Sequence, residues 1–177
     1  MNRIFTTAAA AFLSIGTAFA QTGAINQATT PAAKNAQSML KLVDQQSAEI
    51  SDNTFLMNQA VNRTDDFEYQ SDLLDQVRQE VNQVGRELSV LQAEQGSLAP
   101  WEAAAVDKVV PVMHSVAMES TEAINTFNAN SDRLNASNYR VETTEISKDA
   151  DRANTLLHDD IKLGKVKATE TRLTTSG

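Results

Sequence analysis

Apolar residues recur along this chain at alternating spacings of four and three, which is the pattern of helices that pack side by side in a supercoil. The first of four such segments covers residues 36–61 and includes two polar members, Ser47 and Thr54. Its members are Ala36, Leu40, Val43, Ser47, Ile50, Thr54, Met57 and Val61. We predict one long helix here, with these residues facing a core.

The second and third segments repeat the pattern with bulkier side chains. The second is fully apolar and consists of Phe67, Leu74, Val77, Val81, Val84, Leu88, Leu91 and Leu98. The third consists of Ala103, Val106, Val110, Met113, Ala117, Ser120, Ile124 and Phe127. Because the second segment offers the most apolar area for burial, we expect it to contribute most to stability.

Small and polar residues dominate the fourth segment. Its repeat consists of Tyr139, Thr143, Ile146, Ala150, Ala153, Leu157 and Ile161, the last of these one position late. Burying Ala or Thr removes little apolar area from water, so the sequence predicts that this helix is held least firmly.

Residues that begin or end helices separate the segments. Pro100 and Glu102 suit a first turn, where a missing backbone donor costs nothing and an acidic group favours the helix dipole. Gly164 is the predicted end of the fourth helix. Short loops make successive helices antiparallel. The sequence therefore predicts an all-α, up-down-up-down antiparallel four-helix bundle with coiled-coil-like seams over residues 34–164.

A longer, partly open antiparallel coiled coil that completes its core by dimerising is the alternative architecture. Four seams of similar length can cover one another within a single chain. The closed bundle of one chain is therefore preferred.

The first 20 residues have the features of a secretory signal peptide. Arg3 precedes an apolar stretch that starts at Ile4, and Ala18 and Ala20 form a small-x-small cleavage pattern. The apolar stretch is too short to cross a hydrocarbon core of roughly 30 Å, and no second one follows. We predict cleavage after Ala20, a periplasmic or secreted location, and no transmembrane segment in the mature chain.

Charge differs between the body of the chain and its C-terminal end. The formal net charge is −8 at pH 7, which disfavours nucleic acid as a partner. Four basic residues nevertheless follow Ile161, against one acidic residue. We expect residues 165–177 to form a disordered basic tail and residues 21–33 to form a flexible N-terminal linker.

Several metal and haem sites are excluded by composition. The chain has no cysteine, so disulfides, covalent c-type haem attachment and thiolate metal sites are ruled out. The two histidines, His114 and His158, follow Pro111 and Thr155 by three positions. The Glu-x-x-His motif of ferritin-like carboxylate proteins is therefore missing.

Two weaker ligand sets remain. Exported four-helix b-type cytochromes hold haem between a methionine early in the first helix and a histidine late in the fourth, and Met39 and His158 occupy those places here. Met113, His114 and Met118 combine thioether and imidazole groups, which suit copper. Met39 and His158 flank their seams and Met113 belongs to the core repeat. Structural roles are therefore favoured for both sets, and we predict no cofactor.

Motifs for nucleophilic catalysis or phosphate binding do not occur in the sequence. The chain is therefore predicted to be a non-enzymatic exported bundle that acts by protein–protein interaction, as an adaptor, scaffold or stress-related envelope protein. Its partner would be another envelope or secreted protein, or a second copy. The alternative is a carrier of a small ligand, haem or metal, which would use the Met113 cluster or the polar core residues Ser47, Thr54, Ser120 and Thr143.

Overall fold

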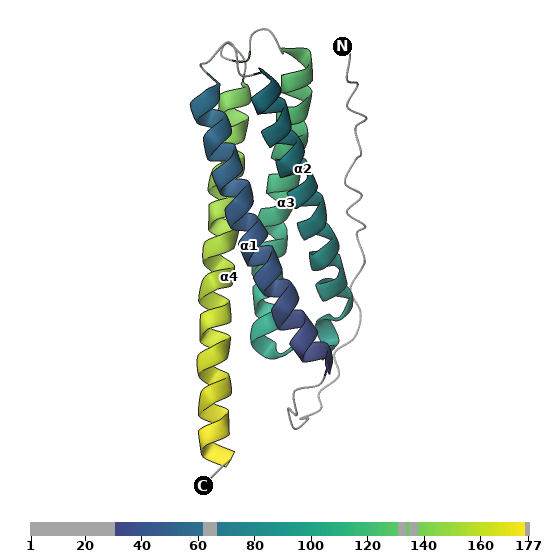
Figure 1. Ribbon diagram of the computed structural model, residues 1–177. Helices are drawn as coiled ribbons and strands as arrows, with labels where there is room; N and C mark the ends of the chain where they lie inside the picture. The colour runs from purple at the N-terminus through teal and green to yellow at the C-terminus, as the bar shows by residue number, and fades with distance from the viewer. Residues whose placement is uncertain (1–30, 62–66, 131–133, 135–137, 176–177) are drawn as a thin grey trace.

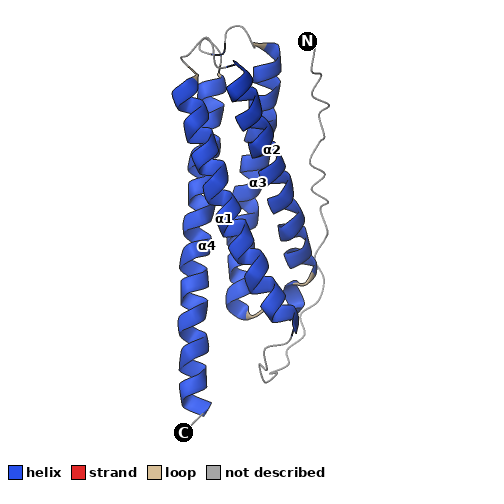
Figure 2. Ribbon diagram, in the orientation of Figure 1, coloured by secondary structure: helices blue, strands red, loops and turns tan. Residues whose placement is uncertain are grey.

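The computed structural model of the 177-residue chain describes residues 31–61, 67–130, 134 and 138–175. The predicted signal peptide, its cleavage site and residues 21–30 of the predicted linker lie outside this part. The described residues form the four α-helices α1 (Pro31–Ala60), α2 (Phe67–Ala93), α3 (Pro100–Ala129) and α4 (Tyr139–Thr175), with a 3₁₀ turn η1 (Gln95–Ser97) after α2. Figure 2 shows this part of the chain as helix and connecting loop, without a strand.

The helices run alternately in opposite directions, α1 and α3 one way and α2 and α4 the other (Figure 1). The last residues of α1 and α3 and the first residues of α2 and α4 lie at one end of the bundle, which we call the loop end. The all-α four-helix bundle predicted from the heptad pattern is confirmed. In the described part of the chain, no helix is both long enough and apolar enough to cross a membrane.

Burial of the predicted seams agrees closely with the sequence in two helices. All seven predicted members in α1 and Val61 just beyond it, and all seven in α4, are buried, and these include the late Ile161. In α2 the seam is buried from Leu74 to Leu91, whereas Phe67 is 45% exposed. Phe67 lies in the first turn, where only one face of its ring is covered, by Phe127 at a centroid distance of 4.8 Å.

Helix α3 buries a wider face than the predicted one. Five of the eight predicted members are buried, namely Val106, Met113, Ala117, Ser120 and Phe127, whereas Ala103, Val110 and Ile124 are only partly buried. The buried face also includes a neighbouring row of residues, Ala105, Val109, Val112, Val116 and Ala123. Close packing of α3 against α4, and not against α2, accounts for the burial of this second row.

Helix α4 packs closely against both α1 and α3, whereas α2 and α3 form the least close of the neighbouring pairs. The inward positions of α4 include Ala150 and Ala153, which are fully buried. Small side chains let two helix backbones approach each other. The expectation that small residues make α4 the least firmly held helix is therefore not what the packing indicates.

Hydrogen bonds between polar side chains line the edge between α1 and α4 at intervals of about two turns. Asn154 Nδ2 donates to the backbone oxygen of Asp44 at 3.0 Å and to Asp44 Oδ1 at 2.9 Å. Ser51 Oγ and Ser147 Oγ lie 3.3 Å apart, and Thr143 Oγ1 donates to Asn58 Oδ1. Each bond contributes only about 1 kcal/mol net, but together they select one register for the two helices.

The predicted end of the fourth helix at Gly164 is wrong, because α4 continues to Thr175. The tail predicted to be disordered is therefore helical through residue 175, and it projects beyond the other three helices (Figure 1). Gly164 has a packing role instead. A Cβ atom at this position would lie 2.5 Å from Cδ2 and Cε2 of Trp101, so the glycine makes room for the indole ring.

Truncation of the second seam should be costly. Leu88 is 1% exposed, and Leu88→Ala leaves a cavity that should lower the free energy of unfolding by roughly 2 to 5 kcal/mol. Urea denaturation measures this loss. Val90 is 43% exposed two positions further on, so Val90→Ala is the matched control and should change stability by less than about 0.5 kcal/mol. Equal losses in the two variants would contradict the described core.

Alanine at position 164 should destabilise the protein, although alanine is favoured over glycine inside helices by about 1 kcal/mol. The added methyl group would overlap the ring of Trp101. In the background of Trp101→Ala this overlap disappears, and Gly164→Ala should then raise stability. A double-mutant cycle by thermal denaturation measures the coupling, and additive effects would show that the two residues do not touch.

Candidate functional site

The two residues of the predicted haem pair belong to different surroundings. Met39 is partly buried and packs against the apolar core. His158 is exposed on α4, near the edge shared with α1. Burial raises the pKa of Asp44 on that edge, and the nearby charge of His158 opposes this rise. His158 is thus an electrostatic neighbour of Asp44, whereas Met39 is a packing residue.

The predicted copper cluster is divided between core and surface. Met113 is 2% exposed, and its sulfur accepts a hydrogen bond from Ser47 Oγ at 3.6 Å. His114 is exposed, and Met118 is 56% exposed. Among the described residues, no three His, Asp or Glu side chains are grouped as a metal site. Of the three predicted copper ligands, one therefore lies in the core and two lie on the surface.

The polar core residues proposed as a ligand site already have partners. Each hydroxyl oxygen lies within hydrogen-bond distance of the backbone oxygen four residues earlier in its own helix, and those of Ser47 and Thr143 also lie within hydrogen-bond distance of Met113 Sδ and Asn58 Oδ1. The donor–acceptor distances are 2.8 Å for Ser47, 2.7 Å for Thr54, 2.6 Å for Ser120 and 3.0 Å for Thr143. These hydroxyl groups are satisfied without a ligand.

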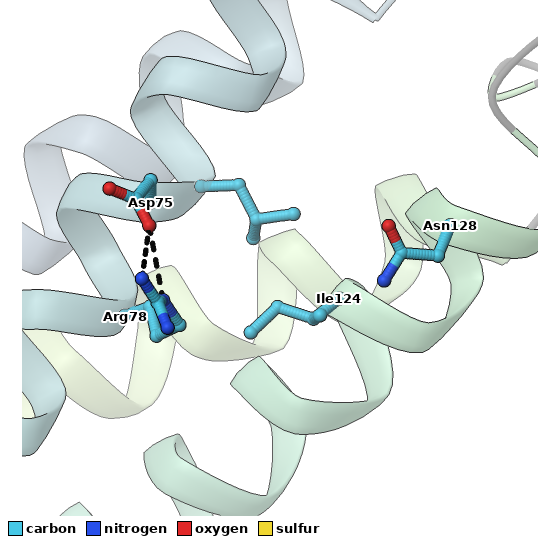
Figure 3. Close-up of a pocket in the computed structure, with 5 residues that line it drawn as sticks. Asp75, Arg78, Ile124 and Asn128 are labelled. Atoms are coloured by element: carbon cyan, nitrogen blue, oxygen red, sulfur yellow. Dashed lines mark hydrogen bonds and ion pairs between the residues drawn. The ribbon is translucent and has the colours of Figure 1, made fainter. Parts of the chain in front are cut away.

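A surface pocket lies between α2 and α3, the least close pair of neighbouring helices. Figure 3 shows Ile124 and Asn128 of α3 facing Asp75 and Arg78 of α2, whose side chains form an ion pair. With Leu74 these residues enclose about 10 Å³, which is room for one water molecule. Pockets for drug-sized ligands measure several hundred Å³. In this conformation the pocket cannot hold an organic cofactor.

A buried polar contact joins three helices at the loop end. Gln70 Nε2 donates to the backbone oxygen of Met57 at 2.7 Å, and Tyr139 Oη donates to Gln70 Oε1 at 3.2 Å. Burial raises the pKa of Tyr139, so its phenol keeps the proton that it donates. The sequence analysis did not identify Gln70, although it lies three residues after Phe67 and four before Leu74 and so continues the repeat.

Exposed apolar side chains gather around this same end. Phe55 and Leu56 lie near the end of α1, Phe67 and Tyr69 lie in the first turn of α2, and Val141 lies in the first turn of α4. Their exposed fractions are 57%, 40%, 45%, 45% and 62%. We call this set the apolar end. The remaining large exposed apolar residues of the described chain are spread over α2, α3 and the far part of α4.

Two carboxyl groups, Glu80 and Glu119, have pKa values raised to about 7, and they lie on two different edges of the bundle. On the edge between α1 and α2, burial raises the pKa of Glu80 to about 7, and the charge of Glu49 adds to this rise. Asn53 Nδ2 opposes it by donating to Glu80 Oε1 at 3.0 Å and to Oε2 at 3.3 Å. Glu119, on the edge between α3 and α4, also has a pKa raised to about 7.

Comparison of the chain with protein-family models, with curated proteins and with solved structures finds no match. Any functional conclusion therefore rests on the residues and geometry of this chain.

Copper binding should not depend on His114. Since Met113 Sδ is buried against Ser47 while His114 and Met118 are exposed, the wild-type protein and His114→Ala should take up copper(I) equally weakly. Competition with a chromophoric copper(I) chelator measures the affinity. Stoichiometric binding that His114→Ala abolishes would establish a copper site that this conformation does not contain.

Proposed function

We propose that this protein is an exported, non-enzymatic helical bundle that acts by binding another protein through its apolar end. The observation that carries the proposal is the clustering of Phe55, Leu56, Phe67, Tyr69 and Val141 at one end of the bundle. Grouped apolar surface that remains exposed is a common mark of protein interaction sites. Export is part of the proposal and rests on the predicted signal peptide.

Aromatic residues make the apolar end suited to binding. Phe55 and Tyr69 are large side chains with few rotatable bonds, so ordering them in an interface costs little conformational entropy. Phe67, a member of the apolar end, stacks on Phe127 at a centroid distance of 4.8 Å. The apolar end is thus in direct contact with the buried core through this ring pair.

Charges around the apolar end indicate the kind of surface that would complement it. Asp52 on α1 and Glu68 and Asp72 on α2 are exposed near the apolar residues, with Arg140 on α4 as a basic neighbour. Among these described residues, three acidic groups against one basic group favour a partner surface that has an apolar centre and a mainly basic rim.

Site-specific photo-crosslinking tests this proposal. A photoreactive amino acid at Phe55 or Val141 should give one dominant adduct in cells of the host, because both positions would lie inside the interface. The same probe at Val90, which is exposed to a similar degree but lies near the other end of α2, is the matched control and should give none.

The mass of the adduct identifies the partner class, since an adduct of twice the chain mass means a second copy. Phe55→Ser with Val141→Ser should abolish partner binding in a purified system, while Val90→Ser should not. Equal crosslinking at Phe55 and Val90 would contradict a binding site at the apolar end.

A further inference from the structure

Four carboxylates lie along the edge between α3 and α4, and we call them the acidic edge: Glu119 and Glu122 of α3, and Glu145 and Asp149 of α4. Their placement follows from the register of the two helices. Lys108 contacts Asp160 and Thr126 contacts Glu142. Because the helices are antiparallel, a residue a given number of positions after Lys108 in α3 lies opposite the residue the same number of positions before Asp160 in α4.

This register sets Glu119 opposite Asp149. Glu119 lies eleven residues after Lys108, and Asp149 lies eleven residues before Asp160. Two carboxylates therefore lie opposite each other, between two favourable contacts along the same helix pair. One contact is the Lys108–Asp160 ion pair at 2.8 Å, and the other is the hydrogen bond that Thr126 donates to Glu142 at 2.8 Å. The α3–α4 contact contains one unfavourable pair between two favourable ones.

Burial of Glu119 is a second feature that disfavours negative charge on its carboxyl group. Its Oε2 atom is buried and has no hydrogen-bond partner among the described residues. A buried oxygen without a donor favours the protonated carboxyl group over the carboxylate. The unpartnered atom and the opposed Asp149 are separate observations, and both disfavour negative charge on Glu119.

Two lysines of this helix pair are engaged elsewhere, while Arg152, three residues after Asp149 on α4, is exposed. Lys148 donates to Glu145 Oε1 at 2.6 Å, and Lys108 pairs with Asp160. On α2, which packs on another side of α3, Arg78 pairs with Asp75. On α4 the groups that act on Glu119 are Asp149 and Glu145, and on α3 the group is Glu122; all three are negative.

We propose that Glu119 and Asp149 make the α3–α4 contact sensitive to pH, so that a proton on Glu119 tightens this side of the bundle and its loss loosens it. Protonation removes one of the two opposed charges and gives Glu119 a hydroxyl donor. Ser120 and Ala150, the buried residues that follow Glu119 and Asp149 in the sequence, do not titrate, so the core beneath stays packed while the edge responds.

The direction of the effect follows from the pKa. Burial, with smaller contributions from Asp149, Glu145 and Glu122, raises the pKa of Glu119 from 4.5 to about 7. The folded protein therefore binds this proton more tightly than the unfolded chain. The resulting stabilisation is complete below about pH 4.5 and is lost as the pH rises through about 7. Glu80 on the α1–α2 edge shifts in the same direction, so the two groups must be separated by mutation.

Urea denaturation of the mature chain at about pH 5.5 and about pH 8.5 tests the proposal. The folded-to-unfolded ratio of the wild-type protein should fall by roughly tenfold at the higher pH. Glu119→Gln mimics the protonated group, and it should recover part of this loss at the higher pH while changing little at the lower. Asp149→Asn should act in the same direction. Asp52→Asn, an exposed carboxyl on α1, is the matched control and should retain the full pH dependence.

Amide hydrogen exchange locates the effect. At the higher pH, protection factors in α3 and α4 around positions 119 and 149 should fall in the wild-type protein and in Glu80→Gln, and should be retained in Glu119→Gln. An unchanged pH dependence in Glu119→Gln would overturn the proposal, as would its complete loss in Glu80→Gln alone. Neither result bears on binding at the apolar end, so the two proposals fail independently.

Discussion

The close packing of α4 against α1 and α3 is the constraint on which the rest of the bundle depends. Ala150 and Ala153 face inward without exposed surface, and Gly164 leaves room for the ring of Trp101. Each small residue contributes little buried area, but together they allow two helices to approach a third closely. Dispersion attraction between the helices is stronger at these short distances. Because α3 turns toward α4, its contact with α2 is less close, and the small pocket lies on that side.

Polar groups set the register of the helices more than they add to stability. The Asn154–Asp44 and Ser147–Ser51 contacts permit one alignment of α1 with α4, and Gln70 ties α2 to Met57 and Tyr139 at the loop end. A shift by one turn would leave these buried groups without partners, at a cost greater than the net value of each bond. The same precision in register, on the α3–α4 side, places two carboxylates opposite each other.

The features of this molecule that could serve binding lie on its surface and not in its core. Buried hydroxyl groups are satisfied within their own helices, and the pocket beside Arg78 holds no more than a water molecule. Exposed aromatic side chains, by contrast, lie at the loop end, and the two carboxyl groups whose pKa values are raised to about 7 lie on two edges. Such a distribution favours the proposed binding of a macromolecule over binding of a small ligand.

Much of the fold was predictable because the heptad repeat is a local signal. The spacing of apolar residues identified four helices, and in α1 and α4 every residue that it predicted to face inward is buried. Pro100 correctly marked the start of α3, because the first turn of a helix tolerates proline. The antiparallel order followed from loop length alone.

Other features depended on contacts between residues far apart in the chain. Two rows of α3 are buried, and the row that contains Val109 and Val116, which the repeat did not predict, owes its burial to the proximity of α4. Glycine is a residue type common at helix ends, yet Gly164 lies inside α4, where it makes room for Trp101, a residue distant in the sequence. The raised pKa of Glu119 requires burial and the opposed Asp149, neither of which a sequence displays. The sequence by itself determined the helices and most of their inward faces, because these depend on local periodicity. The tertiary structure decided helix rotation, the role of the glycine and the ionisation of the edges, because these depend on distances across helices.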